Sequence, residues 1–229
     1  MRNIVIIAIL YFVSSEMACA QADSVGAYDS LYHNYLYDQR KAYFEGLPKE
    51  YDGIIFLGNS ITHWGDWAEL LKTPKAKNRG IAGDISFGIL NRLDEVVAEK
   101  PSKIFIMIGV NDIGRKIPLS VTLANYRKII RRLRIALPHT QVFMQSVLPI
   151  NEKLINRTYY TGTNLEISKM NIALRKLASD NKITYIDLYS QFADKGEMPA
   201  NYTYDGIHLT ASAYILWTNF LKKKGYCCN

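Results

Sequence analysis

Cysteine is scarce in this sequence of 229 residues: it occurs only at positions 19, 227 and 228. The last two are neighbours, and adjacent cysteines cannot cross-link distant parts of a chain, so the fold is not built on disulfides. Histidine is also rare, with four copies, and there is no CxxC or His-rich pair. The sequence therefore predicts neither a metal site nor a cofactor.

A long apolar run is missing as well, because the run at residues 4–13 is too short to span a bilayer as a stable anchor. Arg2 precedes this run and small residues follow at 18–20, which is typical of a secretory signal. Residues 1–20 are predicted to be cleaved off. The mature protein is then expected to be secreted or periplasmic, with no stable membrane anchor.

Two alternatives for this segment stay open. An uncleaved tether or a buried helix would have the same apolar length. Lipidation at Cys19 is the other, although Glu16 stands where a lipoprotein signal carries an aliphatic residue.

No basic segment is interleaved with aromatic residues in a known nucleic-acid-binding pattern, which argues against nucleic acid as a partner. The net charge is nevertheless +7. Much of the excess falls on a predicted amphipathic helix at 120–137, whose basic side is expected to face solvent. The charge weakly favours anionic polymers or sugars. The basic residues of this helix are Arg127, Lys128, Arg131, Arg132 and Arg134.

Hydrophobic residues are plentiful, at 48% with 21% charged, and this composition indicates one globular domain over residues 21–229. Short apolar runs alternate with amphipathic stretches, which is typical of a parallel sheet covered on both faces. The predicted strands cover residues 53–57, 77–81, 103–108, 141–148 and 183–188, and the predicted helices 28–44, 67–71, 86–98, 120–137, 165–180 and 210–224.

The fold class expected from this pattern is α/β, a three-layer α/β/α sandwich with flavodoxin-like strand order 2-1-3-4-5 and an N-terminal aromatic helix. Such folds bind ligands beyond the carboxyl ends of the strands, at the switch point between the first and third strands. The long irregular stretch at 149–164 follows a strand at that edge, and a loop of this length is often part of a site.

Three potential hydrogen-bond donors follow the first three strands. Ser60 lies on the first turn, where it can attack a carbonyl while its N–H points at the resulting oxyanion; the alternative is a helix-capping serine. Gly83 follows the second strand and can bring its N–H close to a ligand. Asn111 follows the third and can donate its side-chain amide. Each is a common turn residue when taken alone, but the three strand exits surround one crevice.

Asp205 and His208 follow the last strand, three positions apart. An aspartate so placed can accept a proton from one imidazole nitrogen and leave the other to activate a serine hydroxyl. His63 and Asp66 show the same separation in reverse order. Because they follow Ser60 directly, His63 would have to fold back on its neighbour to act as its base.

The sequence resembles the SGNH hydrolases of the GDSL esterase and lipase superfamily over residues 53–214. The resemblance implies Ser60 as nucleophile, His208 and Asp205 as its triad partners, and an oxyanion hole of Ser60, Gly83 and Asn111, with no metal or cofactor. Asn59 stands where many members carry Asp, which leaves this mechanism intact. The four similar blocks are Gly58-Asn59-Ser60, Asn78-x-Gly80-x-x-Gly83-Asp84, Gly109-Val110-Asn111-Asp112 and Asp205-x-x-His208.

Length, export signal and the Ser-Ile-Thr-x-x-Gly stretch are similar to secreted acetylesterase-like members, either sialate O-acetylesterase-like or acetylhydrolase-like. The predicted function is thus an exported serine esterase that removes short acyl groups, above all acetyl, from a small-molecule or oligosaccharide ester. Trp64 and Trp67 are candidates to stack on a sugar ring, with core packing as the alternative. Arg115 and Lys116 are candidates to meet a carboxylate on the substrate.

Three other functions stay open. One is a lysophospholipase or thioesterase of the same superfamily. Another is a non-catalytic flavodoxin-like module in which residues 58–62 cradle a phosphate, although phosphate binding has no use for the oriented base at His208. The third is a catalytically inactive carbohydrate-binding relative.

Overall fold

The computed structural model describes residues 30–227, so the predicted signal at 1–20 lies outside the described residues. Five parallel strands form one sheet in the order β2-β1-β3-β4-β5, which confirms the predicted fold class and strand order. The strands are β1 (Ile54–Gly58), β2 (Ala76–Gly80), β3 (Lys103–Met107), β4 (Gln141–Gln145) and β5 (Thr184–Ile186).

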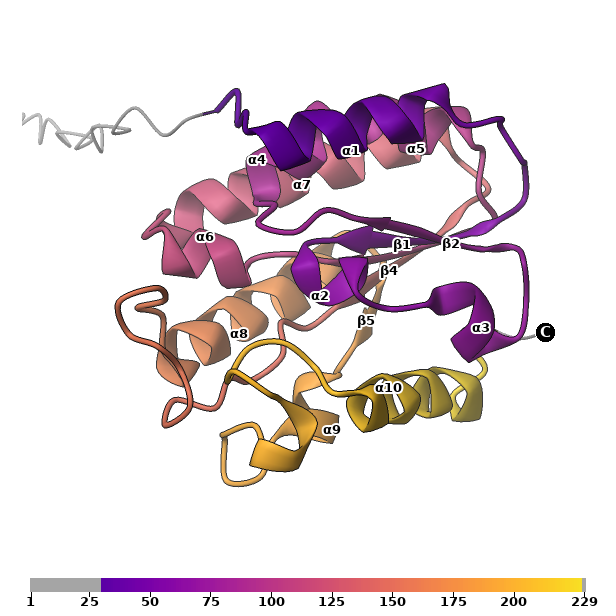
Figure 1. Ribbon diagram of the computed structural model, residues 1–229. Coiled ribbons are helices and arrows are strands. Elements are labelled where there is room, and N and C mark those ends of the chain that lie inside the picture. The colour runs from indigo at the N-terminus through magenta and orange to yellow at the C-terminus, as the bar shows by residue number, and fades with distance from the viewer. Residues whose placement is uncertain (1–29, 228–229) are drawn as a thin grey trace, which may run out of the picture.

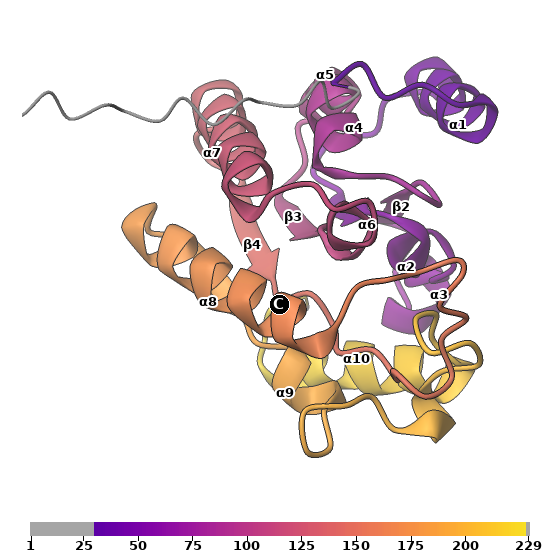
Figure 2. The same ribbon diagram turned by 90° about the vertical axis from the view of Figure 1, so that its left-hand side faces the viewer.

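Helices cover both faces of the sheet (Figures 1 and 2). From β2 onward the chain crosses the sheet in one direction, so right-handed crossovers place the connecting helices on one face. The step from β1 to β2 runs the other way and places its helix on the opposite face. The first group is α4 (Ser86–Asn91), α5 (Leu93–Ala98), α7 (Leu119–Ala136) and α8 (Asn164–Asp180), and the opposite face carries α3 (Trp67–Leu71) packed with α10 (Ala211–Lys223).

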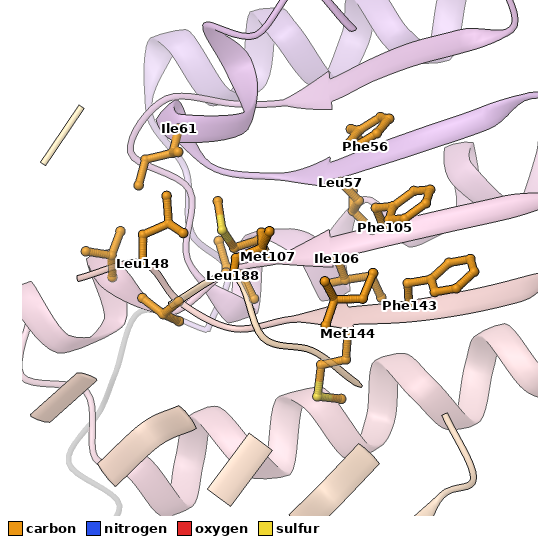
Figure 3. Close-up of a cluster of buried hydrophobic side chains, with 14 of the residues drawn as sticks. Phe56, Leu57, Ile61, Phe105, Ile106, Met107, Phe143, Met144, Leu148 and Leu188 are labelled. Carbon is orange, nitrogen blue, oxygen red and sulfur yellow. The ribbon is translucent and has the colours of Figure 1, made fainter. Parts of the chain in front are cut away.

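The core is organised around a row of phenylalanines that crosses the sheet (Figure 3). Phe56, Phe105 and Phe143 occupy paired positions on β1, β3 and β4, and neighbouring rings stack with centroids 4.8 and 4.6 Å apart. Trp67 of α3 extends the row, stacked 3.9 Å from Phe56. Because side chains alternate along a strand, the residues that follow each Phe face the other helical layer.

Several predicted element lengths are wrong, and the fifth strand covers Thr184–Ile186 instead of residues 183–188. The helix expected at 86–98 is two helices, separated at Arg92, whose side chain turns inward to bind carbonyl groups at the ends of β1 and β2. The fourth strand ends at Gln145 rather than at 148. The cause is Asn171 of α8, whose side-chain amide takes over both hydrogen bonds of the Val147 peptide groups, each at 2.8 Å.

Helix α1 (Tyr35–Gly46) lies beside α4 and α5 (Figures 1 and 2). It begins later than predicted, because the Asn34 side chain caps it by accepting the Tyr37 N–H at 3.0 Å. No helix within residues 30–227 has both the length and the apolar character needed to cross a membrane. The inner side of α1 belongs to a second apolar cluster, made of Tyr32, Tyr37, Phe44, Ile81, Ile85 and Ile117.

Candidate active site

The ends of β1, β2 and β3 are in register, which brings the turns that follow them together. Gly58 is paired with Gly80 on one side and with Met107 on the other. A side chain at Gly58 would place its Cβ 2.4 Å from the Met107 carbonyl oxygen, and one at Gly80 would meet the His63 backbone nitrogen at 2.2 Å. Glycine at both positions therefore lets the turn after β1 lie directly against the strand ends.

Ser60 is the first residue of the short helix α2 (Ser60–His63). The cap of this helix is Asn59, whose side-chain oxygen accepts the Ile61 N–H at 3.0 Å. The alternative function of Ser60 as the capping side chain is therefore wrong. With capping left to Asn59, the Ser60 hydroxyl is available for another partner.

That partner is His208. The Ser60 Oγ lies 2.9 Å from His208 Nε2, and His208 Nδ1 lies 2.6 Å from Asp205 Oδ2. The other carboxylate oxygen of Asp205 accepts the N–H groups of Ile207 at 2.9 Å and His208 at 2.8 Å. The structure thus joins three side chains from opposite ends of the sequence in one hydrogen-bonded chain.

The electrostatics of this loop favour a charged Asp205. Partial burial raises the pKa of the Asp205 carboxyl, but the hydrogen bonds from the His208 ring and from the backbone N–H groups of His208 and Ile207 outweigh it. The net result is a pKa below the ordinary value. An ionised Asp205 holds the proton of the neutral imidazole on Nδ1, which leaves Nε2 as the acceptor that faces Ser60.

The irregular stretch between β4 and α8 packs against the Asp205 loop. The Asn151 N–H donates to the Gly206 carbonyl at 2.8 Å. Gly206 has a φ of +94°, and a Cβ there would lie 2.6 Å from the Ile155 side chain. The stretch therefore supports the loop that carries the histidine.

His63 is turned toward a different partner. Its Nδ1 accepts the Ala82 N–H at 3.3 Å, in the turn after β2. Burial, reinforced by the positive charge of Arg40, lowers the pKa of His63 and keeps the ring neutral as an acceptor. Neither His63 nor Asp66 hydrogen-bonds Ser60, and residues 30–227 contain no group of three or more His, Cys, Asp or Glu side chains placed to hold a metal ion.

The turn after β2 presents Gly83 in a conformation that favours glycine. The Asp84 N–H donates to the Ile81 carbonyl at 3.1 Å, and Gly83, the third residue of this β-turn, has a φ of +80°. Asn111, at the start of α6 (Val110–Gly114), donates one amide hydrogen to the Asp84 carbonyl at 2.9 Å. Its second amide hydrogen remains for a ligand.

A buried arginine ties the first two turns together, and our sequence analysis missed it. The Arg92 guanidinium donates to Asp84 at 2.9 Å and to the carbonyl oxygens of Gly58 at 3.1 Å and Arg79 at 2.8 Å. Burial raises the pKa of Asp84 to about 7, against the opposing charge of Arg92. No sequence signal pointed to this role, because Arg92 is one of three charged residues in the predicted helix at 86–98, with Asp94 and Glu95 close behind it.

Asp112 connects the third turn to the same structure. Its carboxylate accepts the Ser86 N–H at 3.1 Å, the Ser86 hydroxyl at 2.5 Å and the Thr122 hydroxyl at 3.2 Å. Burial raises the pKa of Asp112, in opposition to the Ser86 and Thr122 hydrogen bonds. Asp112, the neighbour of Asn111, therefore fixes the start of α6 to the N-terminus of α4.

One of the four predicted substrate contacts is wrong. Trp67 is only 1% exposed, and its ring is stacked in the core, so it cannot reach a ligand. Trp64 is 57% exposed and lies at the end of the nucleophile helix α2. Arg115 is exposed, with its guanidinium 5.3 Å from the Tyr32 ring centroid, whereas exposed Lys116 faces Glu166 at 3.5 Å.

Tyr204 is a further exposed aromatic residue near the site that the sequence analysis did not name, although its position directly before Asp205 was a signal that could have found it. Its ring lies nearly parallel to the His208 imidazole, at 16°, with centroids 5.9 Å apart. The side chain is 64% exposed. It therefore offers a flat apolar surface next to the histidine.

The five-stranded sandwich with this strand order is the SGNH hydrolase fold. Residues 56–216, more than half of the chain, match the profile of the GDSL-like lipase/acylhydrolase family. The chain belongs to this family and is a carboxylic ester hydrolase of the GDSL type.

Several named proteins are similar to it at low identity. The GDSL esterase/lipase CPRD49 of Arabidopsis thaliana is 26% identical over 185 residues, covering 69% of this chain and 72% of that protein. An acetylxylan esterase of Geobacillus stearothermophilus is 24% identical over 159 residues, covering 65% and 71%. A solved Streptococcus pneumonia structure described as a platelet activating factor has a TM-score of 0.76 at 28% identity, covering 82% of this chain and 92% of that one.

Proposed function

We propose that the protein is an exported serine esterase that removes short acyl groups, above all acetyl, from a carbohydrate. The observation that carries the catalytic part is the hydrogen-bonded chain from Ser60 through His208 to Asp205. A phosphate-cradling module would not need a histidine held between a serine and a carboxylate. The same geometry therefore disfavours the flavodoxin-like phosphate-binding alternative.

In the proposed mechanism, Ser60 Oγ attacks the ester carbonyl while His208 Nε2 takes the hydroxyl proton. Asp205 stabilises the imidazolium that forms. Collapse of the tetrahedral intermediate breaks the bond to the alcohol, which receives the proton from His208. Water, deprotonated by the same imidazole, then attacks the acyl-serine. The bond from the acyl carbon to Ser60 Oγ breaks, His208 returns the proton to Ser60, and the carboxylic acid leaves.

The oxyanion would be bound by the N–H groups of Ser60 and Gly83 and by the side-chain amide of Asn111. Among the described residues, neither N–H donates to a protein acceptor, and Asn111 keeps one amide hydrogen after its bond to Asp84. Donors that are held in place before the reaction need no reorganisation when negative charge develops. This is the arrangement that acyl transfer requires.

Two observations support the substrate part of the proposal. The similar Geobacillus protein is named an acetylxylan esterase. Trp64 and Tyr204 are both exposed, one at the end of the nucleophile helix and one on the catalytic histidine, and exposed rings of this kind can stack on a sugar. Arg115 and Lys116 would favour an anionic sugar, so O-acetylated sialic acid should be compared with acetylated xylo-oligosaccharides. Equal rates on both would remove any role for these two cations.

Export belongs to the same proposal and is supported by the apolar run at 4–13 with small residues at 18–20. N-terminal sequencing of the exported protein should begin at Gln21. A chain that begins at Met1, or one lipidated at Cys19, would contradict it.

The nucleophile is tested by covalent trapping. An organophosphate should add once, at Ser60, and Ser60→Ala or His208→Ala should each lower turnover by roughly 10³-fold or more. Peptide mapping locates the label, and hydrolysis of p-nitrophenyl acetate gives the rates. His63→Ala is the matched control, because His63 lies on the same short helix as Ser60 but its ring accepts from the Ala82 N–H. The His63→Ala variant should still be labelled at Ser60. Labelling at another serine, or full activity in Ser60→Ala, would overturn the assignment.

A further inference from the structure

Tyr32 lies against the Gly83 turn, although it comes from the segment before α1 and lies outside the matched residues 56–216. It is 3% exposed, and its hydroxyl donates to the Gly83 carbonyl oxygen. Burial, with the charge of Asp84, raises the pKa of Tyr32 to about 12, so the hydroxyl keeps the proton that it donates.

The backbone of Tyr32 is in a conformation that a tyrosine rarely adopts. Its φ is +40°, in the left-handed region, where a bulky side chain is strained and persists only if its surroundings hold it. Asn91 of α4 supplies part of this hold by donating its side-chain amide to the carbonyl oxygens of Ser30 at 2.8 Å and Leu31 at 3.0 Å. The Tyr37 ring packs edge-on against the Tyr32 ring, with the ring centroids 5.0 Å apart.

Tyr32 also contacts the turn that carries Asn111. The guanidinium of Arg115 lies 5.3 Å from the Tyr32 ring centroid. Arg115 in turn donates its backbone N–H to the Asn111 carbonyl at 2.9 Å. One side chain from the N-terminal segment therefore contacts the Gly83 turn directly and, through Arg115, the end of the helix that carries Asn111.

We infer that Tyr32 is a positioning residue, which holds the Gly83 turn so that its N–H, together with the Asn111 amide, meets the oxyanion. This inference rests on the proposed esterase function. The donors contribute most when they are fixed before charge develops, so releasing the turn weakens binding of the transition state more than binding of the ester. The expected signature is a loss of kcat with little change in KM.

The test compares Tyr32→Phe with Tyr37→Phe. Both substitutions keep a ring and remove a buried hydroxyl bond to a backbone carbonyl, because Tyr37 donates to the Gly88 oxygen at 2.8 Å. The Tyr32 hydroxyl also interacts with the Asn34 side chain, and Tyr32→Phe removes that contact as well. Gly88 lies within α4 and carries none of the proposed donors. Tyr32→Phe should lower kcat roughly tenfold, less than the 10² to 10³ expected for deleting a whole donor, and Tyr37→Phe should stay within about twofold of wild type. Equal kcat values for the two variants would overturn the inference.

A second measurement separates positioning from general loosening of the fold. Sulfur accepts hydrogen bonds more weakly than oxygen, so a thionoester benefits less from the oxyanion donors than the matching oxoester does. Tyr32→Phe should therefore lower the oxoester rate more than the thionoester rate, whereas a structural defect would lower both equally. If the wild-type protein hydrolyses neither ester, the proposed function itself fails, and that result is distinct from failure of the inference.

Discussion

At the scale of single residues, His208 and His63 both lie near Ser60 but differ in the hydrogen-bond partners of their ring nitrogens. His208 uses Nδ1 for Asp205 and Nε2 for Ser60, so its ring is fixed at both ends. His63 uses Nδ1 to accept from Ala82 and is held neutral by burial. The spacing of acid and histidine is the same in both pairs, and only the contacts across the sheet distinguish the base from its neighbour.

The lowered pKa of Asp205 predicts an acid-side loss of stability. A carboxyl whose pKa is lower in the folded than in the unfolded protein stabilises the fold above its unfolded value, near 4, and loses this contribution as the pH falls through the folded value. Wild type should therefore exceed Asp205→Asn in melting temperature at pH 7, and the difference should shrink below about pH 4. Thermal unfolding between pH 2 and 7 measures it.

Asp66→Asn is a suitable control for this experiment, because the Asp66 side chain does not hydrogen-bond the helix that it precedes. Its difference from wild type should stay flat over the same range. A difference for Asp205→Asn that is independent of pH would contradict the assigned hydrogen bonding.

At the scale of secondary-structure elements, Arg92 is the residue that joins the end of β1 to the turn after β2. The chain forms two helices, α4 and α5, that are separated at Arg92. The Arg92 guanidinium donates hydrogen bonds to the carbonyl oxygens of Gly58 and Arg79 and to the buried Asp84 carboxylate. Breaking a buried ion pair by removing one partner is costly, because the other charge loses its compensation.

Arg92→Leu should accordingly lower the free energy of unfolding by about 3–5 kcal/mol. Urea denaturation measures the change, and the double variant with Asp84→Asn should cost less than the sum of the two single variants, since both remove the same pair. Arg132→Ala is the matched control: Arg132 pairs with Asp94, which is 89% exposed, and the loss should stay within about 1 kcal/mol. A loss within about 1 kcal/mol for Arg92→Leu would contradict this role of Arg92.

The sequence predicted the strand order because apolar runs alternate with amphipathic stretches along the chain. It suggested the members of the site because short motifs, similar to those of a known family, follow these runs. Apolar runs mark the strands, and Ser60, Gly83 and Asn111 directly follow them. It did not predict the supports of the site, because neither Arg92 nor Tyr32 belongs to a recognisable local motif, and Tyr32 acts on a turn 51 positions away. Trp67 was misassigned since helical spacing alone does not say which side of a short helix meets the core.

At the scale of the whole molecule, the site lies at one edge of the sheet, between turns and the stretch at 146–163. Within that stretch, Ile155 is buried beside Gly206 in the loop of Asp205 and Tyr160 is buried beside Gly114 of α6, whereas Leu154 is 46% and Tyr159 81% exposed. A crevice bordered in this way gains little from a longer acyl chain. A closed apolar site, by contrast, would gain about 0.8 kcal/mol for each buried methylene.

For p-nitrophenyl esters of two to twelve carbons, kcat/KM should therefore be highest at two to four carbons. In a closed apolar pocket it would instead rise about fourfold with each added methylene until the pocket is full. Initial rates at subsaturating substrate, below the micelle concentration of the longer esters, decide between the two. A maximum at eight carbons or more would favour the lysophospholipase or thioesterase alternative.

The different burial of the three tryptophans also makes the protein its own fluorescent reporter. Trp67 and Trp217 are buried and pack against each other at 4.9 Å, so their emission should follow unfolding and be sheltered from acrylamide. Trp64 is exposed at the end of the nucleophile helix, where acrylamide reaches it readily. In a Trp64→Phe background the remaining emission reports on the core, and the difference from wild type isolates a signal beside the site that an added sugar can quench or shift.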